Sequence, residues 1–239
     1  MRGDIPGDCD GVACLRRLVD FAEPTPDDVC LDVARGDDRP VATAIRSRVR
    51  DLTAVDLERA LSLPYADNAF TLVTARYPVH QRADPGAALR EMLRVCRPGG
   101  RLILADRIKT NSMAAERAPL QVSLPSLTRL TGSLADAGAE VRRLDVFVVE
   151  RPAEPWLAGC DDARAAEIRR ALVAEIDGGP ATGARPRVIG GELWFTQSCA
   201  HIAAVPRVRR GGSVPLRHAG VVSAHPGADG DPAAPAGRA

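Results

Sequence analysis

The sequence contains a single lysine, Lys109, so almost every basic side chain is arginine. Together with abundant alanine, this usage is typical of a bacterial genome of high GC content, and it argues against interpreting each arginine as a phosphate contact. Basic and acidic residues nearly balance, 32 against 31. A dedicated nucleic-acid-binding domain concentrates positive charge on one surface, so we expect no nucleic-acid partner.

Long apolar runs and paired cysteines are also missing. No stretch approaches the roughly 20 apolar residues of a membrane span, and the first ten residues lack the apolar core of a signal peptide. The six cysteines include no C-x-x-C pair, and no cysteines and histidines stand at the spacing of a zinc site. We therefore expect reduced cysteines, no metal, no membrane and a cytoplasmic location.

Aromatic residues are scarce, at 3% of the chain against 45% for all apolar residues, so aliphatic side chains must fill the core. Residues 206–239 are rich in Gly, Pro and Ala and show no apolar periodicity. Such a composition buries too little surface to offset the entropy of ordering. We expect residues 206–239 to form a disordered tail behind a domain that comprises residues 1–205.

Strand-like and helix-like patterns alternate within that domain. Apolar strand-like runs occupy residues 29–34, 53–57, 70–75 and 101–106, with helical periodicity at 12–22, 39–52 and 85–96. Two further helical patterns, at 124–138 and 163–176, accompany strands at 139–150 and 190–205. This order predicts an α/β fold with a doubly wound, Rossmann-like, mostly parallel sheet and an antiparallel C-terminal edge.

The run from Leu63 to Asp106 reads LPYADNAFTLVTARYPVHQRADPGAALREMLRVCRPGGRLILAD. It resembles the class I S-adenosylmethionine-dependent methyltransferases, in particular the subgroup that includes the ubiquinone and menaquinone enzymes. In that subgroup an LPFPDxSFDLV strand entry precedes a DPxxALxExxRVLxPGG helix and a buried strand that ends in Asp. The resemblance extends over Val12–Pro206 and implies S-adenosyl-L-methionine as cofactor and a small molecule as methyl acceptor.

The stretch LDVARGDDRP corresponds to the family's cofactor loop, D-x-[GA]-x-G-x-G. Asp32, Ala34 and Gly36 match this pattern and would shape the loop beside the cofactor's methionine portion, but Asp38 replaces the last glycine. Glycine permits close backbone approach, whereas an ordinary residue in the left-handed region costs about 1–2 kcal/mol. Asp38 is equally suited to be the N-cap of a helix with Pro40 in its first turn, and both interpretations stay open.

A second departure from the family follows the second strand. The resemblance assigns Asp56 to the ribose hydroxyls, which a carboxylate can accept, and Leu57 to packing on adenine. Only 13 residues separate Asp56 from Phe70, whereas a βαβ unit needs about 30. We therefore expect the third, edge strand and its flanking helices to be missing. Arg59 stands where the family carries an acidic residue near adenine, and arginine cannot accept that contact.

The resemblance also assigns roles to two residues after the fourth family strand. Arg76 would lie near the cofactor tail, and His80 would face the acceptor, as a base or as a structural hydrogen-bonding residue. The predicted activity is methyl transfer to a small molecule. The alternatives are a non-catalytic paralogue that acts as a binding or regulatory subunit, and a different reaction on the same fold. A homodimer or a partner subunit is a further possibility.

Overall fold

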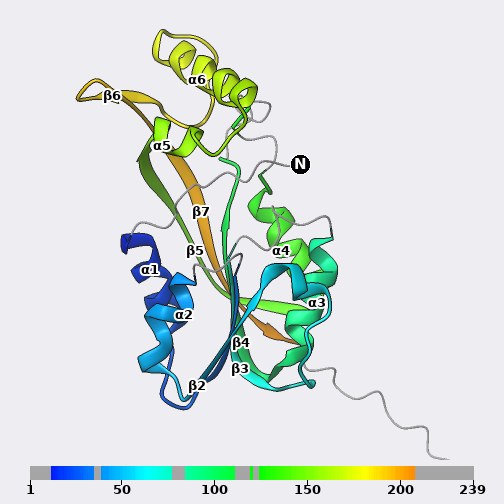
Figure 1. Cartoon of the computed structure of the whole chain (residues 1–239). Coiled ribbons are helices and arrows are strands. Elements are labelled where there is room, and N and C mark those ends of the chain that lie inside the picture. Colours follow the sequence, from blue (N-terminus) through cyan, green and yellow to red (C-terminus); the bar gives the residue numbers. More distant parts are fainter. Residues whose placement is uncertain (1–11, 35–38, 77–83, 111–118, 121–123, 208–239) are drawn as a thin grey trace, which may run out of the picture. The chain divides into compact units, whose positions relative to one another are not determined.

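A computed structural model of the chain describes residues 12–34, 39–76, 84–110, 119–120 and 124–207 (Figure 1). One sheet has the strand order β2-β1-β3-β4-β7-β5, and a short β6 pairs with β7. The strands are β1 (Val29–Ala34), β2 (Asp51–Asp56), β3 (Phe70–Arg76), β4 (Cys96–Arg107), β5 (Ala139–Pro152), β6 (Arg187–Ile189) and β7 (Glu192–Pro206).

The sheet is mostly parallel, as predicted. Strands β2, β1, β3 and β4 run parallel to one another, whereas β7 is antiparallel to both of its neighbours, β4 and β5. The antiparallel strand therefore lies inside the C-terminal half of the sheet, and β5 forms its edge. The predicted α/β, Rossmann-like fold class is confirmed.

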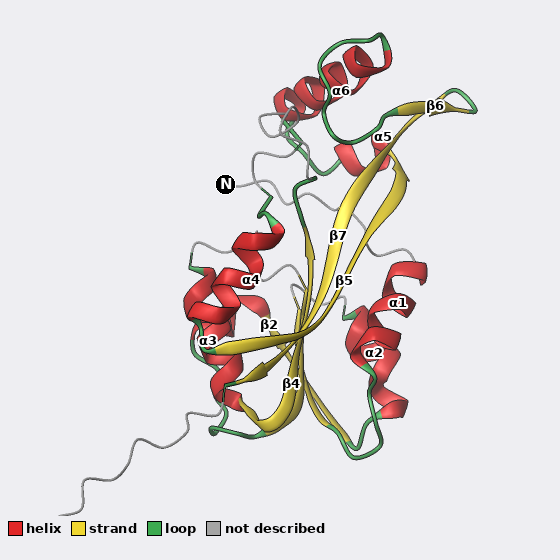
Figure 2. Cartoon of the chain, turned by 180° about the vertical axis from the view of Figure 1, so that it is seen from behind, coloured by secondary structure: helices red, strands yellow, loops and turns green. Residues whose placement is uncertain are grey.

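Helices cover both faces of the sheet (Figures 1 and 2). The helices α1 (Val12–Ala22) and α2 (Pro40–Ile45) pack on one face, and α3 (Pro85–Val95) and α4 (Leu127–Asp136) pack on the other. Successive strand residues alternate between these two layers, so that Cys30 packs with α1 and α2 whereas Leu31 packs with α3. Two aliphatic cores result, one on each side of the sheet.

Helix α3 shows how the sequence sets an element's limits. The Asp84 carboxylate accepts a hydrogen bond from the Ala87 amide at 2.9 Å, and Pro85 occupies the first turn, where its missing N–H does no harm. Four apolar residues at helical spacing, Ala88, Leu89, Met92 and Leu93, are buried against the sheet.

The segment between β2 and β3 contains no strand. Residues 57–61 form the 3-10 helix η2 (Leu57–Leu61), and residues 62–69 return the chain to the start of β3. The Arg94 guanidinium of α3 donates to the carbonyls of Leu63 and Tyr65, at 3.1 and 2.9 Å, and fixes this return against α3. The expected loss of the third, edge strand is confirmed, and β2 forms the edge in its place.

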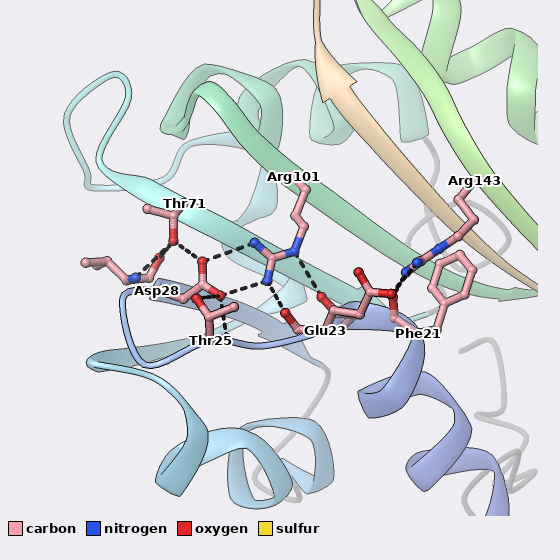
Figure 3. A network of polar contacts seen from close by, with 9 residues as sticks. Phe21, Glu23, Thr25, Asp28, Thr71, Arg101 and Arg143 are labelled. Atoms are coloured by element: carbon pink, nitrogen blue, oxygen red, sulfur yellow. Dashed lines mark hydrogen bonds and ion pairs between the residues drawn. The ribbon is translucent and has the colours of Figure 1, made fainter.

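A polar network ties the amino ends of the strands to α1 (Figure 3). The buried Asp28 carboxylate accepts from both Arg101 Nη atoms, at 3.1 and 2.7 Å, and from the Thr71 hydroxyl at 2.5 Å. Arg101 also donates to the carbonyls of Ala22 and Glu23 at the end of α1. Hydrogen bonds from Arg101 hold the pKa of Asp28 well below its usual range, although burial opposes this.

The far ends of β5 and β7 carry a smaller unit with its own core. The helices α5 (Ala153–Leu157) and α6 (Asp162–Ile176) pack there with Phe195 of β7, and the Trp156 and Phe195 rings meet edge to face at 5.2 Å. The apolar pattern at 163–176 predicts α6, whereas no pattern in the sequence predicts the short α5 or β6.

Two other sequence predictions need correction or lie outside the described residues. The helix predicted at 39–52 is shorter, because α2 ends at Ile45 and gives way to the 3-10 helix η1 (Arg46–Arg48) and to β2. Its N-cap position is Arg39 instead of Asp38. Asp38 and residues 208–239 lie outside the described part, so the predicted tail stays a prediction. None of the helices in the described ranges is long and apolar enough to span a membrane.

Candidate functional site

The carboxyl ends of the parallel strands gather at one edge of the sheet. Ala34 at the end of β1 is the register partner of Asp56 at the end of β2, and Arg76 ends the neighbouring β3. In turn, Arg76 pairs with Ala105 of β4. In open α/β sheets ligands bind outside this edge. The structure therefore brings three predicted site residues, Ala34, Asp56 and Arg76, to the edge formed by the carboxyl ends of the parallel strands.

Asp32 has a structural place inside the sheet. Its carboxylate is 1% exposed and accepts from the Thr74 hydroxyl at 2.6 Å and from the Ala42 amide at 3.2 Å. Burial raises the pKa of this carboxyl, against the lowering effect of the Thr74 and Ala42 hydrogen bonds. Asp32 thus joins β1 to β3 and to the first turn of α2, and it sets where the loop between them begins.

The loop after β1 is only partly described. Ala34 is a small, buried residue at the last position of β1. Gly36 and the aspartate at position 38 lie outside the described residues, and so does His80 after β3. Their predicted roles stay predictions.

Asp56 and Leu57 continue the same edge at the end of β2. The Asp56 carboxylate is half-buried and accepts from the Glu58 amide at 2.8 Å, which caps η2. The Leu57 side chain is 2% exposed and packs in the main core with Val55 and Leu63, so it offers little surface to an adenine ring. Arg59 is exposed on η2.

A hollow adjoins the Arg76 end of this edge. It lies between α1 and the sheet, is partly open to solvent, and has a volume of about 20 Å³, which is room for a group the size of a water molecule or a hydroxyl. It is lined by Cys14, Leu15, Leu18, Arg76, Ala105, Asp106, Phe147, Cys199 and His201. Arg76 is half-buried at its border, whereas His201 is almost fully buried.

His201 is a residue of this hollow that no sequence motif indicates. It lies within an apolar strand, and burial lowers the pKa of its imidazole from 6.5 to about 4, so the ring is neutral near pH 7. The signal available in the sequence was a histidine inside an otherwise apolar run, between Ala200 and Ile202. Among the described residues, no group of His, Cys, Asp and Glu side chains is arranged to hold a metal ion.

The part of the chain that forms this edge is also the part that is similar to known proteins. Residues 29–104, from β1 into β4, match the family model for a methyltransferase domain. The chain is 60% identical over 47 residues to the uncharacterised protein YafE of Escherichia coli K12, which covers 20% of this chain and 23% of that protein. It is 35% identical over 121 residues to the demethylmenaquinone methyltransferase of Mycolicibacterium vanbaalenii, or 48% and 53% of the two chains.

The fold is shared over a longer stretch than the sequence similarity. A Bacillus halodurans protein, provisionally assigned as a methyltransferase, superposes with a TM-score of 0.65 at 24% identity, over 81% of this chain and 99% of that one. The chain spans between 23% and 53% of the length of the first curated relatives. The methyltransferase domain over residues 29–104, the demethylmenaquinone methyltransferase relatives and the shared fold together support a class I S-adenosylmethionine-dependent methyltransferase.

Proposed function

We propose that the chain binds S-adenosyl-L-methionine at the carboxyl edge of β1, β2 and β3 and transfers its methyl group to a small-molecule acceptor. The observation that supports this most directly is the register of β1 and β2, in which Asp56 lies beside Ala34. A carboxylate next to a side chain of minimal bulk suits a ribose whose two hydroxyls donate hydrogen bonds.

Each predicted site residue would contact a different part of the cofactor or the acceptor. Asp56 would hold the ribose, and the segment from Asp32 to Gly36 would pass the methionine portion, with Arg76 beside the cofactor tail. The bound cofactor supplies a methyl group that is already activated by its sulfonium. The protein's contribution is then largely to align the acceptor with that methyl group, for which His80 stays a candidate.

The alternative is a non-catalytic paralogue that acts as a binding or regulatory subunit. It is supported by the aspartate in the glycine loop, by Arg59 in place of an acidic residue, and by a Leu57 side chain that is committed to the core. A cytoplasmic location, a homodimer or a partner subunit, and the absence of a nucleic-acid partner stay predictions under either function.

Calorimetric titration of the purified full chain with S-adenosylmethionine and S-adenosylhomocysteine tests the proposal. We expect binding in the micromolar range and a loss of about tenfold or more in Asp56→Asn, which keeps an acceptor for the Glu58 amide but has one acceptor oxygen fewer for the ribose. The control is Asp51→Asn, the same change at the other end of β2, which we expect to bind normally.

Two results would argue against the proposal. A folded protein that gives no heat at millimolar ligand does not bind the cofactor and favours the non-catalytic paralogue. Equal affinities for Asp56→Asn, Asp51→Asn and the unchanged chain would place the cofactor elsewhere on the sheet.

A further inference from the structure

His201 is a buried polar residue with one ring nitrogen that lacks a hydrogen-bond partner among the described residues. The residue is 4% exposed, and its Nδ1 atom has no hydrogen-bond partner in the described part of the chain. Leaving a buried donor or acceptor unsatisfied costs about 1–3 kcal/mol, so native structures rarely do so without a reason. The same residue lines the hollow beneath α1, which gives a ligand access to it.

The strand register places His201 in a row of side chains across the sheet. Arg76 of β3 pairs with Ala105 of β4, Ala105 pairs with His201 of β7, and His201 pairs with Asp145 of β5. Asp145 is engaged by Arg17 of α1, whose Nε and Nη2 atoms donate to the two carboxylate oxygens at 2.7 and 2.8 Å. The β5 side of His201 is therefore closed, whereas the Arg76 side leads toward the ends of β1 and β3.

Aromatic and aliphatic groups form the walls around the imidazole. The Phe147 ring lies edge-on to His201 at 4.7 Å, and the Phe21 ring is tilted against it at 5.5 Å. The guanidinium of Arg17 covers the outer face of Phe147 at 4.3 Å. Leu15 and Leu18 of α1 complete the apolar lining. Apolar walls around one convergent polar atom suit a ligand that places a single hydroxyl inside and leaves the rest of its apolar part on the open side of the hollow.

The charges in the hollow favour a neutral ligand. Arg76 and Asp106 carry opposite charges, and the buried imidazole is neutral near pH 7 because burial holds its pKa at about 4. A neutral imidazole presents one donor and one acceptor nitrogen, which matches a hydroxyl group in either direction. A ligand anion or cation would meet no uncompensated charge here that could offset its loss of hydration.

We propose that this hollow receives the hydroxyl-bearing end of a neutral, largely apolar methyl acceptor, and that His201 Nδ1 forms the hydrogen bond that selects this hydroxyl. The inference rests on the proposed function, since it assigns the acceptor to the side of Arg76 that faces away from β1. His201 is then a specificity-determining residue that orients the acceptor, and the hydrogen bond involves no transfer of a proton.

Nuclear magnetic resonance of the full chain with labelled histidine side chains tests the hydrogen bond. The probes are 4-methylphenol and toluene, which have nearly the same apolar ring and differ in the hydroxyl group. We expect 4-methylphenol to shift the imidazole signals of His201, identified by their absence in His201→Phe, and to bind about tenfold more tightly than toluene.

Two variants separate the hydrogen bond from the shape of the hollow. His201→Phe keeps an aromatic ring between Phe21 and Phe147, and we expect it to bind 4-methylphenol only as weakly as toluene. His201→Asn carries an amide near the position of Nδ1, and we expect it to retain affinity within about threefold. Circular dichroism and thermal melting show whether each variant is folded.

The outcomes also separate this inference from the proposed function. Equal binding of the two probes, binding of 4-methylphenol that His201→Phe does not weaken, or no binding of either probe at millimolar concentration would overturn the hydroxyl site. Binding of S-adenosylhomocysteine is measured independently, by calorimetry. With both ligands bound, nuclear Overhauser contacts between 4-methylphenol and S-adenosylhomocysteine support the acceptor role, and their absence overturns it.

Discussion

Burial acts on His201 more strongly than the charges around it, and this has a consequence for stability. Asp145 on β5 raises the pKa of the imidazole, whereas Arg17 on α1 and Arg76 at the end of β3 lower it. Burial is the largest effect and brings the pKa from 6.5 to about 4. The unfolded chain thus takes up a proton at this residue at a higher pH than the folded chain.

The stability that a neutral His201 contributes is complete above about pH 6.5 and is lost as the pH falls toward 4. Between about pH 7 and about pH 4.5 we expect the unchanged chain to lose roughly 2 kcal/mol more of its free energy of unfolding than His201→Phe. Urea unfolding followed by circular dichroism at the two pH values measures this difference.

Comparing the two proteins cancels the contributions of groups that titrate in both, including Asp28 with its lowered pKa and Asp32 with its raised pKa. His225→Phe, in the C-terminal segment, serves as a second histidine replacement. If His201→Phe loses as much stability on acidification as the unchanged chain, the imidazole is not held neutral by burial.

At the scale of elements, replacing either of two glycines with alanine is expected to change the free energy of unfolding in opposite directions. A Cβ atom at Gly100, in β4, would lie 2.8 Å from the Thr71 carbonyl oxygen and 2.9 Å from that of Arg97. A Cβ atom at Gly132, within α4, would meet no atom within 4 Å. The first site needs glycine for close approach of backbones at the β3–β4 irregularity, whereas the second does not.

We expect Gly100→Ala to reduce the free energy of unfolding by about 2 kcal/mol, because backbone atoms must shift to admit the methyl group. Gly132→Ala should raise it by about 0.5–1 kcal/mol, because alanine restricts the unfolded chain and favours the helix. Chemical denaturation of both variants checks the two signs. Equal effects would mean that β4 tolerates a side chain at its glycine, contrary to the geometry.

The elements that the sequence predicts well are those whose limits are set locally. Asp84 and Pro85 begin α3, and the glycines after Pro98 follow its end, so the helix could be predicted within about a residue. The short link of residues 57–69 likewise predicted the missing edge strand from length alone. Both arguments need only residues that are neighbours in the sequence.

Prediction was weaker where distant residues decide the outcome. Leu57 matched a family position, but its side chain is directed into the core by packing with Leu63 and with α3. His201 was overlooked because the face of β7 on which it lies, and its cover by α1, depend on strand pairing across the sheet. Asp32 was predicted at the cofactor loop, and its hydrogen bond to Ala42 depends on where α2 begins.

At the scale of the whole domain, the separate hydrophobic cores predict that the region of α5 and α6 unfolds locally while the main sheet stays folded. Among the described residues, the third cluster around Trp156, Leu157 and Phe195 shares no buried residue with the two clusters of the main sheet. The strands β5 and β7 run through both regions. Units with their own small core often open below the free energy of global unfolding. We therefore expect the amides of α6 to exchange hydrogen faster than those of β1 and β4.

Phe195→Ala tests this independence, since Phe195 is 1% exposed and packs edge to face on Trp156. We expect the variant to lower the opening free energy of α6 by about 3 kcal/mol and to leave the protection of β1 nearly unchanged. Leu104→Ala in the main core should do the reverse, because it weakens the sheet without touching the third cluster. Hydrogen exchange read by mass spectrometry resolves the two regions. If both variants accelerate exchange in α6 and β1 to the same degree, the distal helices and the sheet unfold as one cooperative unit.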